Sequence, residues 1–353
     1  MSKDSFTDYL GCILLKGIGW FARLWPVSFS LFLGRRAGDL IYWLDLRHKA
    51  LAYAHIKQAL GGRKTCVELR KLTREFYQGF GQNLTEIFLI PSIDKEYVKK
   101  YVRFQGLEHI EQGFREGKGV ILLGVHSGSW ELSNVICAAL GFPFDLLVRD
   151  QQHPRLNELL NKYRTRHGCK IIQRQNQVRD LVKALKNNEA IGMTLDQGGK
   201  SGTLVEFFGK EASMATGAVR LALKYDSPII PTYFTRLKGP YIQTIIEPPF
   251  RVKRTLEAQN DVRENLRELV SIFEKNISRY PKDYFWQYKI WKYGRDKEIL
   301  VLSDGKAGHL RQSQAVARSV SSCVREKGGL AEIRTLEVSF KNAWAKKALV
   351  SGS

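Results

Sequence analysis

The stretch "GVILLGVHSGSWELSN", residues 119–134, joins an apolar run to a polar segment that contains His126 and Glu131. A short apolar run of this kind, ending in glycine and serine, is typical of a buried strand, here residues 119–125. Ser127 or Ser129 can cap a following helix over 129–140, and Gly141 can close it. The sequence therefore predicts a strand, a tight turn and a helix, with His126 at the carboxyl end of the strand.

His126 and Glu131 are five residues apart, so on one helix they would point about 140° away from each other. They can meet only if His126 precedes the helix and Glu131 lies in its first turn. There the helix N-terminus keeps Glu131 ionised. An ionised carboxylate can hold one imidazole nitrogen protonated and leave the other as a base. We therefore consider His126 and Glu131 as a catalytic pair.

Three other interpretations of this segment are possible. A zinc site is poorly supported, because H-E-x-x-H is absent and no other His or Cys lies nearby at ligand spacing. A serine hydrolase would need G-x-S-x-G, whereas residues 124–128 read G-V-H-S-G, with histidine at the nucleophile position. A structural role, in which His126 bonds a neighbouring carbonyl group, stays open on this segment alone.

From about residue 100 onward, strand-like runs alternate with helical patterns, which predicts an α/β fold with a largely parallel central sheet flanked by helices. A helical segment is predicted over residues 1–90. The strands at 228–235 and 241–247 are joined by "RLKGP" and predict an antiparallel hairpin at the edge of the sheet. The other predicted strands are 119–125, 144–148, 169–173 and 190–195, and the predicted helices are 129–140, 154–167, 177–187, 215–225 and 258–278.

Polar residues follow several of these strands. Arg149 follows the strand at 144–148, and Asp196 and Gln197 follow the strand at 190–195. If the strands are parallel, these residues share with His126 the edge at which open α/β sheets bind ligands. Arg166 lies late in the helix predicted at 154–167. The joint placement of these residues favours a functional site over scattered surface charges.

The chain has 353 residues, 44% of them hydrophobic, and a formal net charge of +21. This charge favours an anionic partner such as nucleic acid, an anionic membrane face or a phosphorylated substrate. Residues 10–33 mix bulky apolar and aromatic side chains with Lys16 and Arg23. This mixture suits a helix in the membrane interface better than an uninterrupted span, and a buried helix is the alternative. The five cysteines are scattered, which favours a reducing compartment.

The ordered set of motifs resembles the late acyltransferases of lipid A biosynthesis (the lauroyl and myristoyl transferases), within the lysophospholipid acyltransferase superfamily. The resemblance covers about residues 10–293. It rests on "HSGSWE" (126–131), "LVRDQQHPRLNELLNKYRTRHG" (147–168), "GMTLDQGGKSGTLVEFFGKEASMATGAVRLAL" (192–223), "PIIPTYFTR" (228–236) and "YFWQYKIWKY" (284–293).

The resemblance implies a general-base role for His126 and an orienting role for Glu131. It places Arg149 and Arg166 near a phosphorylated acceptor or the donor's phosphopantetheine, and Asp196 and Gln197 at the acceptor pocket. The implied reaction moves an acyl chain from acyl carrier protein or coenzyme A to a glycolipid hydroxyl, without a metal or redox cofactor. The implied location is the cytoplasmic face of a bacterial inner membrane, on an anionic surface.

Two rival functions are kept. A glycerol-phosphate or lysophospholipid acyltransferase is less favoured, because that branch usually has H-x-x-x-x-D and E-G-T-R, which are absent here. A basic binding module without chemistry is the other rival. Nucleic acid is disfavoured as its partner, because the aromatic residues lie in apolar helices rather than between Lys and Arg on strands.

Residues 298–353 begin a further strand–loop–helix pattern. "LVLSDGKAGHLRQSQAVA" (300–317) resembles the opening of glycosyltransferase-like proteins related to the mitochondrial fission protein family. About 55 residues do not normally complete such a domain. The predicted organisation is therefore a helical membrane-interface segment at 1–90, an acyltransferase domain at 91–297 and an incomplete second α/β domain at 298–353.

Overall fold

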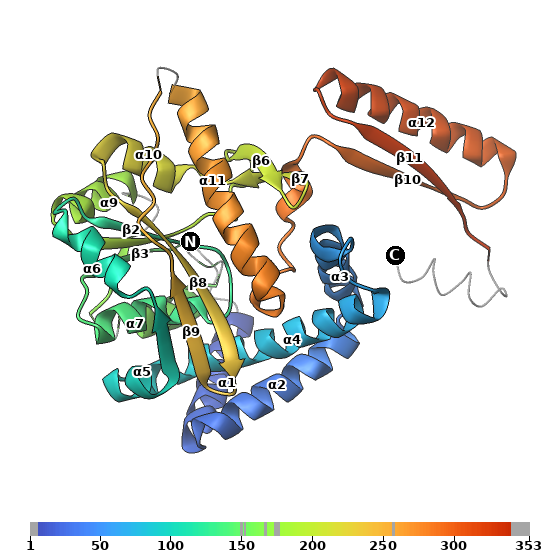
Figure 1. The fold of residues 1–353 in the computed structure, drawn as a ribbon. Helices are drawn as coiled ribbons and strands as arrows, with labels where there is room; N and C mark the ends of the chain where they lie inside the picture. Colours follow the sequence, from blue (N-terminus) through green and yellow to red (C-terminus); the bar gives the residue numbers. More distant parts are fainter. Residues whose placement is uncertain are drawn as a thin grey trace. The chain divides into compact units, whose positions relative to one another are not determined.

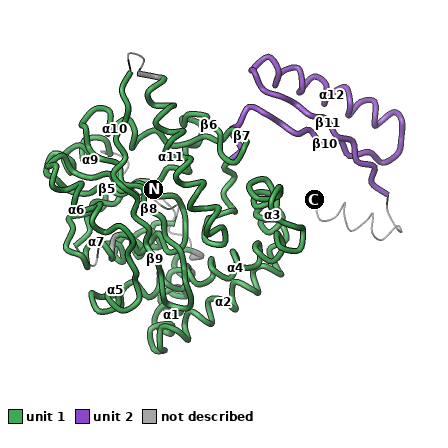
Figure 2. Tube along the Cα trace, viewed as in Figure 1, with its two compact units in different colours: residues 1–290 green, residues 291–353 purple. Residues whose placement is uncertain are grey.

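The computed structural model describes residues 6–148, 151, 153–165, 168–172, 177–255 and 258–339. The chain divides into two compact units, residues 1–290 and 291–353 (Figure 2). The N-terminal helices belong to the first unit rather than forming a unit of their own. All the residues that the sequence analysis selects for chemistry also fall within the first unit.

A mixed sheet forms the centre of the first unit and confirms the predicted α/β class (Figure 1). Every neighbouring pair of its strands is parallel except β8 and β9. Within the described residues its seven strands run in the order β1 (Val102–Gln105), β9 (Tyr241–Ile246), β8 (Ile229–Lys238), β2 (Val120–Gly124), β5 (Ala190–Thr194), β3 (Phe144–Leu147) and β4 (Lys170–Ile172).

The β8–β9 hairpin is antiparallel as predicted, but its predicted place at the sheet edge is wrong. β8 pairs with β2 on its other side, and β1 adds a further strand outside β9. β1 was not predicted because it has four residues, and Arg103 and Gln105 leave too little apolar pattern to recognise. The short hairpin of β6 (Thr203–Phe207) and β7 (Lys210–Met214) was also not predicted.

Helices cover both faces of the sheet (Figure 1). α6 (Glu108–Arg115) and α7 (Ser133–Ala139) pack on one face, and α10 (Gly217–Tyr225) and α11 (Ala258–Arg279) pack on the other. α8 (Pro154–Thr165) and α9 (Gln177–Lys186) pack against the strands at the β4 end of the sheet. The helix predicted at 129–140 begins with a separate 3-10 turn, η2 (Trp130–Leu132), before α7. This break affects the direction of the Glu131 side chain.

The N-terminal region is helical, as predicted. It contains α1 (Phe6–Leu24), α2 (Val27–Leu44), α3 (Leu46–Leu60) and α4 (Cys66–Leu89), followed by η1 (Ile90–Ser92) and α5 (Lys95–Tyr101). A capping box between Thr65 and Glu68 begins α4. α4 contacts both η2 and η4 (Pro281–Asp283), so it lies against the segments that flank the carboxyl end of β2. Among the helices that the structure describes, none has the length and apolar character needed to cross a bilayer.

The second unit contains the predicted strand, glycine-bearing loop and helix. β10 (Lys297–Ser303) and β11 (Ala331–Glu337) form a parallel pair, and α12 (Ala307–Glu326) connects them. The glycosyltransferase-like resemblance of this unit stays a prediction.

α2 and α4 approach each other closely through three glycines. A Cβ added at Gly38 would lie 2.2 Å from the Tyr77 carbonyl oxygen and 2.9 Å from the Gln78 Cα. Gly34 and Gly81 oppose each other in the same way, since a Cβ on Gly81 would lie 2.2 Å from the Gly34 carbonyl oxygen. These contacts are with backbone atoms, which cannot move aside as a flexible side chain can.

We therefore expect Gly38→Ala to force α2 and α4 apart and to lower the free energy of unfolding by about 1–3 kcal/mol. Thermal or urea unfolding followed by circular dichroism measures this change. Gly62→Ala is the matched control, because a Cβ there meets nothing within 4 Å. Equal stability of the two variants would contradict the close helix contact.

Candidate active site

His126 lies just beyond the carboxyl end of β2, in a loop that backbone hydrogen bonds hold on one side. The amide of Phe285 donates to the His126 carbonyl oxygen at 2.8 Å, and the amide of Gly128 donates to the Asp283 carbonyl oxygen at 2.8 Å. The Ser127 hydroxyl oxygen accepts a hydrogen bond from the Phe234 amide at 3.2 Å. The segment around residues 283–285 therefore fixes the position of the His126 loop.

Asp196 is the acidic partner of His126. Asp196 Oδ1 lies 2.8 Å from His126 Nδ1, and Oδ2 accepts the His126 backbone amide at 3.0 Å. The Asp196 side chain is buried, so its charge depends on these partners. With Nδ1 donating its proton to Asp196, Nε2 carries the lone pair that a general base needs.

This arrangement changes the pKa of His126. Burial by itself would lower the pKa, but the charge of Asp196 and its hydrogen bond outweigh burial, and Glu131 adds a smaller attraction. The net pKa lies above the usual value for histidine. Tyr284 is buried nearby, and burial together with the Asp196 charge raises its pKa. The Tyr284 phenol therefore stays neutral beside the carboxylate.

Glu131 does not make the contact with His126 that the sequence analysis predicts. Its carboxylate forms a two-pronged ion pair with Arg164, with Arg164 Nε at 3.0 Å from Oε2 and Nη2 at 2.7 Å from Oε1. The orienting contact predicted for Glu131 is made by Asp196 instead. The physical reason is the 3-10 turn η2, which directs the Glu131 side chain toward the last turn of α8, where Arg164 lies.

Gln197 lies at the free nitrogen of the imidazole, with its Nε2 3.2 Å from His126 Nε2. The amide group therefore occupies the position from which a substrate hydroxyl would give up its proton. The 3-10 turn η2 begins at Trp130, four residues after His126. Its first hydrogen bond is donated by the Leu132 amide to the Ser129 carbonyl oxygen at 2.9 Å. The preceding amides have no acceptor within that turn, as is general at helix starts.

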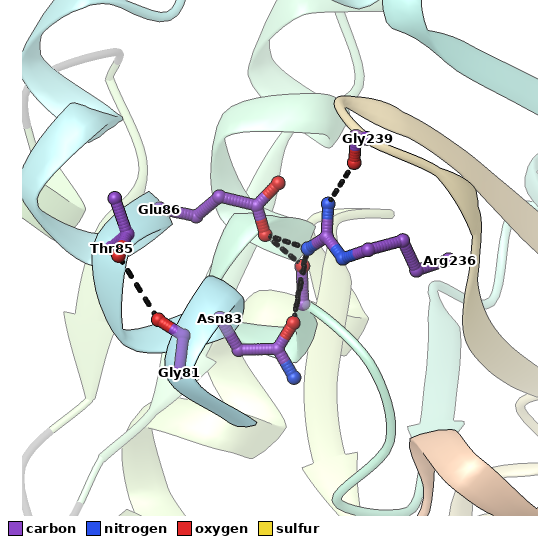
Figure 3. A network of polar contacts seen from close by, with 7 residues as sticks. Gly81, Asn83, Thr85, Glu86, Arg236 and Gly239 are labelled. Atoms are coloured by element: carbon purple, nitrogen blue, oxygen red, sulfur yellow. Dashed lines mark hydrogen bonds and ion pairs between the residues drawn. The ribbon is translucent and has the colours of Figure 1, made fainter. Parts of the chain in front are cut away.

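A buried polar cluster holds Ser129, three residues after His126, through hydrogen bonds with Glu86 and Arg236. Figure 3 shows the side chains of Arg236, Glu86 and Asn83 that meet there. Arg236 on β8 pairs with Glu86 on α4, and its Nη2 also donates to the Ser129 hydroxyl oxygen at 2.7 Å and to Asn83 Oδ1 at 3.0 Å. The Ser129 hydroxyl also bonds Glu86. Arg236 and Glu86 are buried, so removal of either would leave an unpaired charge in the core.

A chamber of about 820 Å³ opens beside His126. His126, Glu131, Arg164 and Gln197 lie at its polar part, together with the glycine-rich segment 198–202. The rest of its wall is mainly apolar. Its apolar members include Ile110, Leu122, Ile136, Leu140, Phe144, Leu146, Phe234 and Ile246. The described part of the site therefore combines an oriented imidazole with a hydrocarbon-lined space.

Four of the predicted site residues lie within the described structure, and His126, Glu131 and Gln197 line the chamber. Asp196 is buried behind His126 and is not among the residues that line the chamber, and its predicted role at the acceptor pocket stays a prediction. Arg149 and Arg166 lie outside the described residues, so their predicted roles stay predictions.

Four further residues of the site were not predicted from the sequence, namely Arg164, Glu86, Ser129 and Arg236. Only Arg236 carries a recognisable signal, because it ends the otherwise apolar and hydroxyl-bearing run 228–236. A cation at the end of a buried strand requires a carboxylate partner. The sequence gives no indication that this partner is Glu86, which is 150 positions away.

A sequence model of the family described as "Bacterial lipid A biosynthesis acyltransferase" matches residues 3–293. The chain belongs to this family. It is similar to the lipid A biosynthesis palmitoleoyltransferase of Escherichia coli, with 25% identity over 78% of this chain and 89% of the relative.

Two further relatives extend this comparison. The lipid A biosynthesis acyltransferase of Haemophilus influenzae is 25% identical over 58% of this chain, an alignment that spans 64% of the relative. The phosphatidylinositol mannoside acyltransferase of Mycobacterium tuberculosis is 22% identical over 66% of this chain and 72% of the relative. Family membership confirms the predicted resemblance and the acyltransferase class.

Replacement of Asp196 or of Glu131 by the corresponding amide should change the pH profile of the reaction to different extents. Asp196→Asn removes the main attraction that holds the His126 pKa up, so the acidic limb of kcat/KM should move to lower pH. At neutral pH kcat/KM should fall about 10²–10⁴-fold, because the ring loses its orientation. Glu131→Gln should move the limb in the same direction by less. The measurement is kcat/KM for acyl transfer against pH.

The signs follow from the chemistry of the base. The neutral imidazole is the active form, so activity is lost as the pH falls through the His126 pKa, and a lower pKa extends activity to lower pH. A larger displacement in Glu131→Gln than in Asp196→Asn would restore Glu131 as the principal partner of His126.

Proposed function

We propose that this protein transfers a fatty acyl group from an acyl carrier protein or coenzyme A thioester to a hydroxyl of a phosphorylated glycolipid similar to a lipid A precursor. The observation that carries this proposal is the His126 Nε2 lone pair beside an apolar chamber. A base alone would suit many hydrolytic or transfer reactions. A base at the end of a hydrocarbon-lined space suits a reaction whose substrate has a long apolar chain.

The proposed mechanism begins when the acceptor hydroxyl displaces the Gln197 amide and bonds to His126 Nε2. His126 takes the hydroxyl proton while the oxygen attacks the thioester carbonyl carbon. The carbonyl oxygen becomes an oxyanion, for which the amides at the start of η2 are candidate donors. When the carbon–sulfur bond breaks, the imidazolium returns the proton to the sulfur. The products are an ester and a free thiol.

Asp196 stabilises the imidazolium that forms during this reaction, because a buried carboxylate already bonds Nδ1. The Glu131–Arg164 pair contributes a fixed polar wall beside the reacting groups. Arg149 and Arg166 stay the expected contacts for a phosphate group, and Lys200 adds a cation to the part of the wall formed by residues 198–202. This mechanism assigns every proton transfer to side chains of the chain itself.

A glycolipid acceptor is favoured over glycerol phosphate by the range of relatives. The relatives named above are acyltransferases of lipid A and of phosphatidylinositol mannoside, whose names share a lipid that carries sugar. The glycolipid class is therefore the common property on which the proposal rests.

His126→Ala should abolish thioester-dependent acyl transfer to the level of the uncatalysed reaction, because the variant lacks the nitrogen that takes the proton of the acceptor hydroxyl. The measurement is mass spectrometry of glycolipids from cells with the wild-type chain, the variant or neither. Cys66→Ala is a surface control that should retain activity, since Cys66 is exposed at the start of α4. Undiminished transfer by His126→Ala would exclude the base role.

We also propose that α1 and the start of α2 lie on the anionic cytoplasmic surface of a bacterial inner membrane. A row of aromatic rings runs from Phe21 through Trp25 and Phe29 to Phe32, with successive centroids 6.1, 5.0 and 6.4 Å apart. All four side chains are exposed to solvent, and Trp20 is 62% exposed. Aromatic rings with neighbouring Lys and Arg are typical of helices that lie in a membrane interface.

The variant Trp25→Glu/Phe29→Glu should reduce sedimentation with anionic phospholipid vesicles several-fold, because two carboxylates would replace rings at the lipid surface. Val67→Glu/Val178→Glu is the control, since it places the same two charges on exposed apolar residues of α4 and α9. Equal binding by both variants and the wild type would place the membrane contact elsewhere.

A further inference from the structure

The part of the chamber that α6 and α7 line lies against one face of the sheet. Alternate residues of a strand point to the same face, and the chamber is lined by Leu122 and Gly124 on β2 and by Gly192 and Thr194 on β5. α6 and α7 cover this space. The depth of the chamber can therefore be measured along these strands, from His126 toward their amino ends.

The depth can be counted along the strands. His126 lies four residues beyond Leu122, which corresponds to about 13 Å at the usual rise of a strand. Leu122 is in register with Gly192, and Gly192 with Leu146. The next residues on the same face, Val120 and Ala190, are fully buried in the core below.

Phe144 lies at this depth, over Gly192. A Cβ added at Gly192 would lie 2.5 Å from Cζ of the Phe144 ring and 3.2 Å from Leu146 Cδ1. Any side chain at position 192 would therefore occupy the space of the ring. Phe144 lines the chamber and is only 4% exposed, so its ring forms part of the chamber wall and is also packed into the core.

The opposite side of the chamber suits the end of a hydrocarbon chain less well. There the wall includes Thr244 on β9, whose hydroxyl is buried and has no hydrogen-bond partner among the described residues. A hydrocarbon chain beside this hydroxyl could not form a hydrogen bond with it, so the free-energy cost of burying the unpaired hydroxyl would remain. The Phe144 side offers Leu122, Leu146 and the aromatic ring instead.

We propose that the Phe144 ring, seated over Gly192, is the end wall that sets the length of the acyl chain that the enzyme transfers. This inference rests on the proposed acyl transfer from a thioester. A chain that enters beside His126 meets the ring about four strand residues below. A longer chain would have to displace a ring that Leu146 and the core hold in place.

The test gives the 353-residue chain a lipid A precursor as acceptor and an equimolar mixture of saturated acyl thioesters from decanoyl to stearoyl, and mass spectrometry measures the ratio of products. Phe144→Leu and Phe144→Ala should shift the preferred length upward, more strongly for alanine. One additional methylene in an apolar pocket is worth roughly tenfold or more in kcat/KM, so the product ratio should change by at least about that factor.

Phe114→Leu is the matched control. Phe114 stacks on Phe142 with centroids 5.4 Å apart and packs against the same core cluster, but it does not line the chamber. Its product ratio should equal that of the wild type. Thermal unfolding of each variant identifies any that do not fold, and Phe144→Leu retains an apolar side chain of sufficient size to keep the core packed.

Two results would overturn the assignment. One is a folded, active Phe144 variant with the wild-type product ratio. The other is a shift to longer chains in Phe104→Leu but not in Phe144→Leu, since Phe104 lines the β1 side of the chamber. Failure of the proposed function is distinguishable, because then the wild-type chain itself would transfer none of the acyl groups.

Discussion

The site depends on the pair of bonds that Asp196 makes to one residue, to the Nδ1 atom of His126 and to its backbone amide. A single hydrogen bond to the ring would leave the imidazole able to rotate about it. Two bonds to the same residue fix both the backbone and the ring, so the lone pair of Nε2 points in one direction. Because Asp196 is buried, it cannot exchange these bonds for water at low cost. The imidazole is therefore oriented before any substrate binds.

The same bonds also explain why Glu131 can have another partner. The chain turns at Gly128, whose φ is +50°, against the backbone of Phe234, and the following 3-10 turn carries Glu131 to α8. Arg164 meets it there with two parallel bonds, a geometry that favours arginine over lysine. Glu131 still raises the pKa of His126 through its charge, although it does not touch the ring. Two carboxylates thus act on one imidazole, one by contact and one at a distance.

Much of the fold could be predicted from local patterns, because buried strands such as β2 and β5 are apolar runs bounded by turns. His126, Asp196 and Gln197 could also be predicted, because each directly follows such a run. The hydrogen-bond partners of these residues could not be predicted. A five-residue spacing suggests that His126 pairs with Glu131, whereas Asp196, 70 positions away, reaches it because β2 and β5 are neighbours in the sheet. Sequence order alone does not give strand order.

β1 shows the same limit for the edge of the sheet. Its four residues alternate too briefly to be recognised, yet they pair in parallel with β9 and make the predicted edge hairpin internal. This changes what surrounds the chamber. With β1 outside β9, Phe104 closes the chamber on that side, and solvent does not reach Thr244. The chamber is therefore more enclosed than a sheet ending in the β8–β9 hairpin would allow.

Helix α4 connects the N-terminal helices to the chemistry. It packs against α1 and α2, and it also carries Glu86, which holds Arg236 and Ser129 in the buried cluster. Ser129 lies between His126 and the 3-10 turn whose first amides face no intrahelical acceptor. Removal of the N-terminal helices would therefore remove Glu86, which is the buried partner of Arg236 and also bonds Ser129. α4, against which the helices with the exposed aromatic row pack, is thus a structural support of the His126 loop.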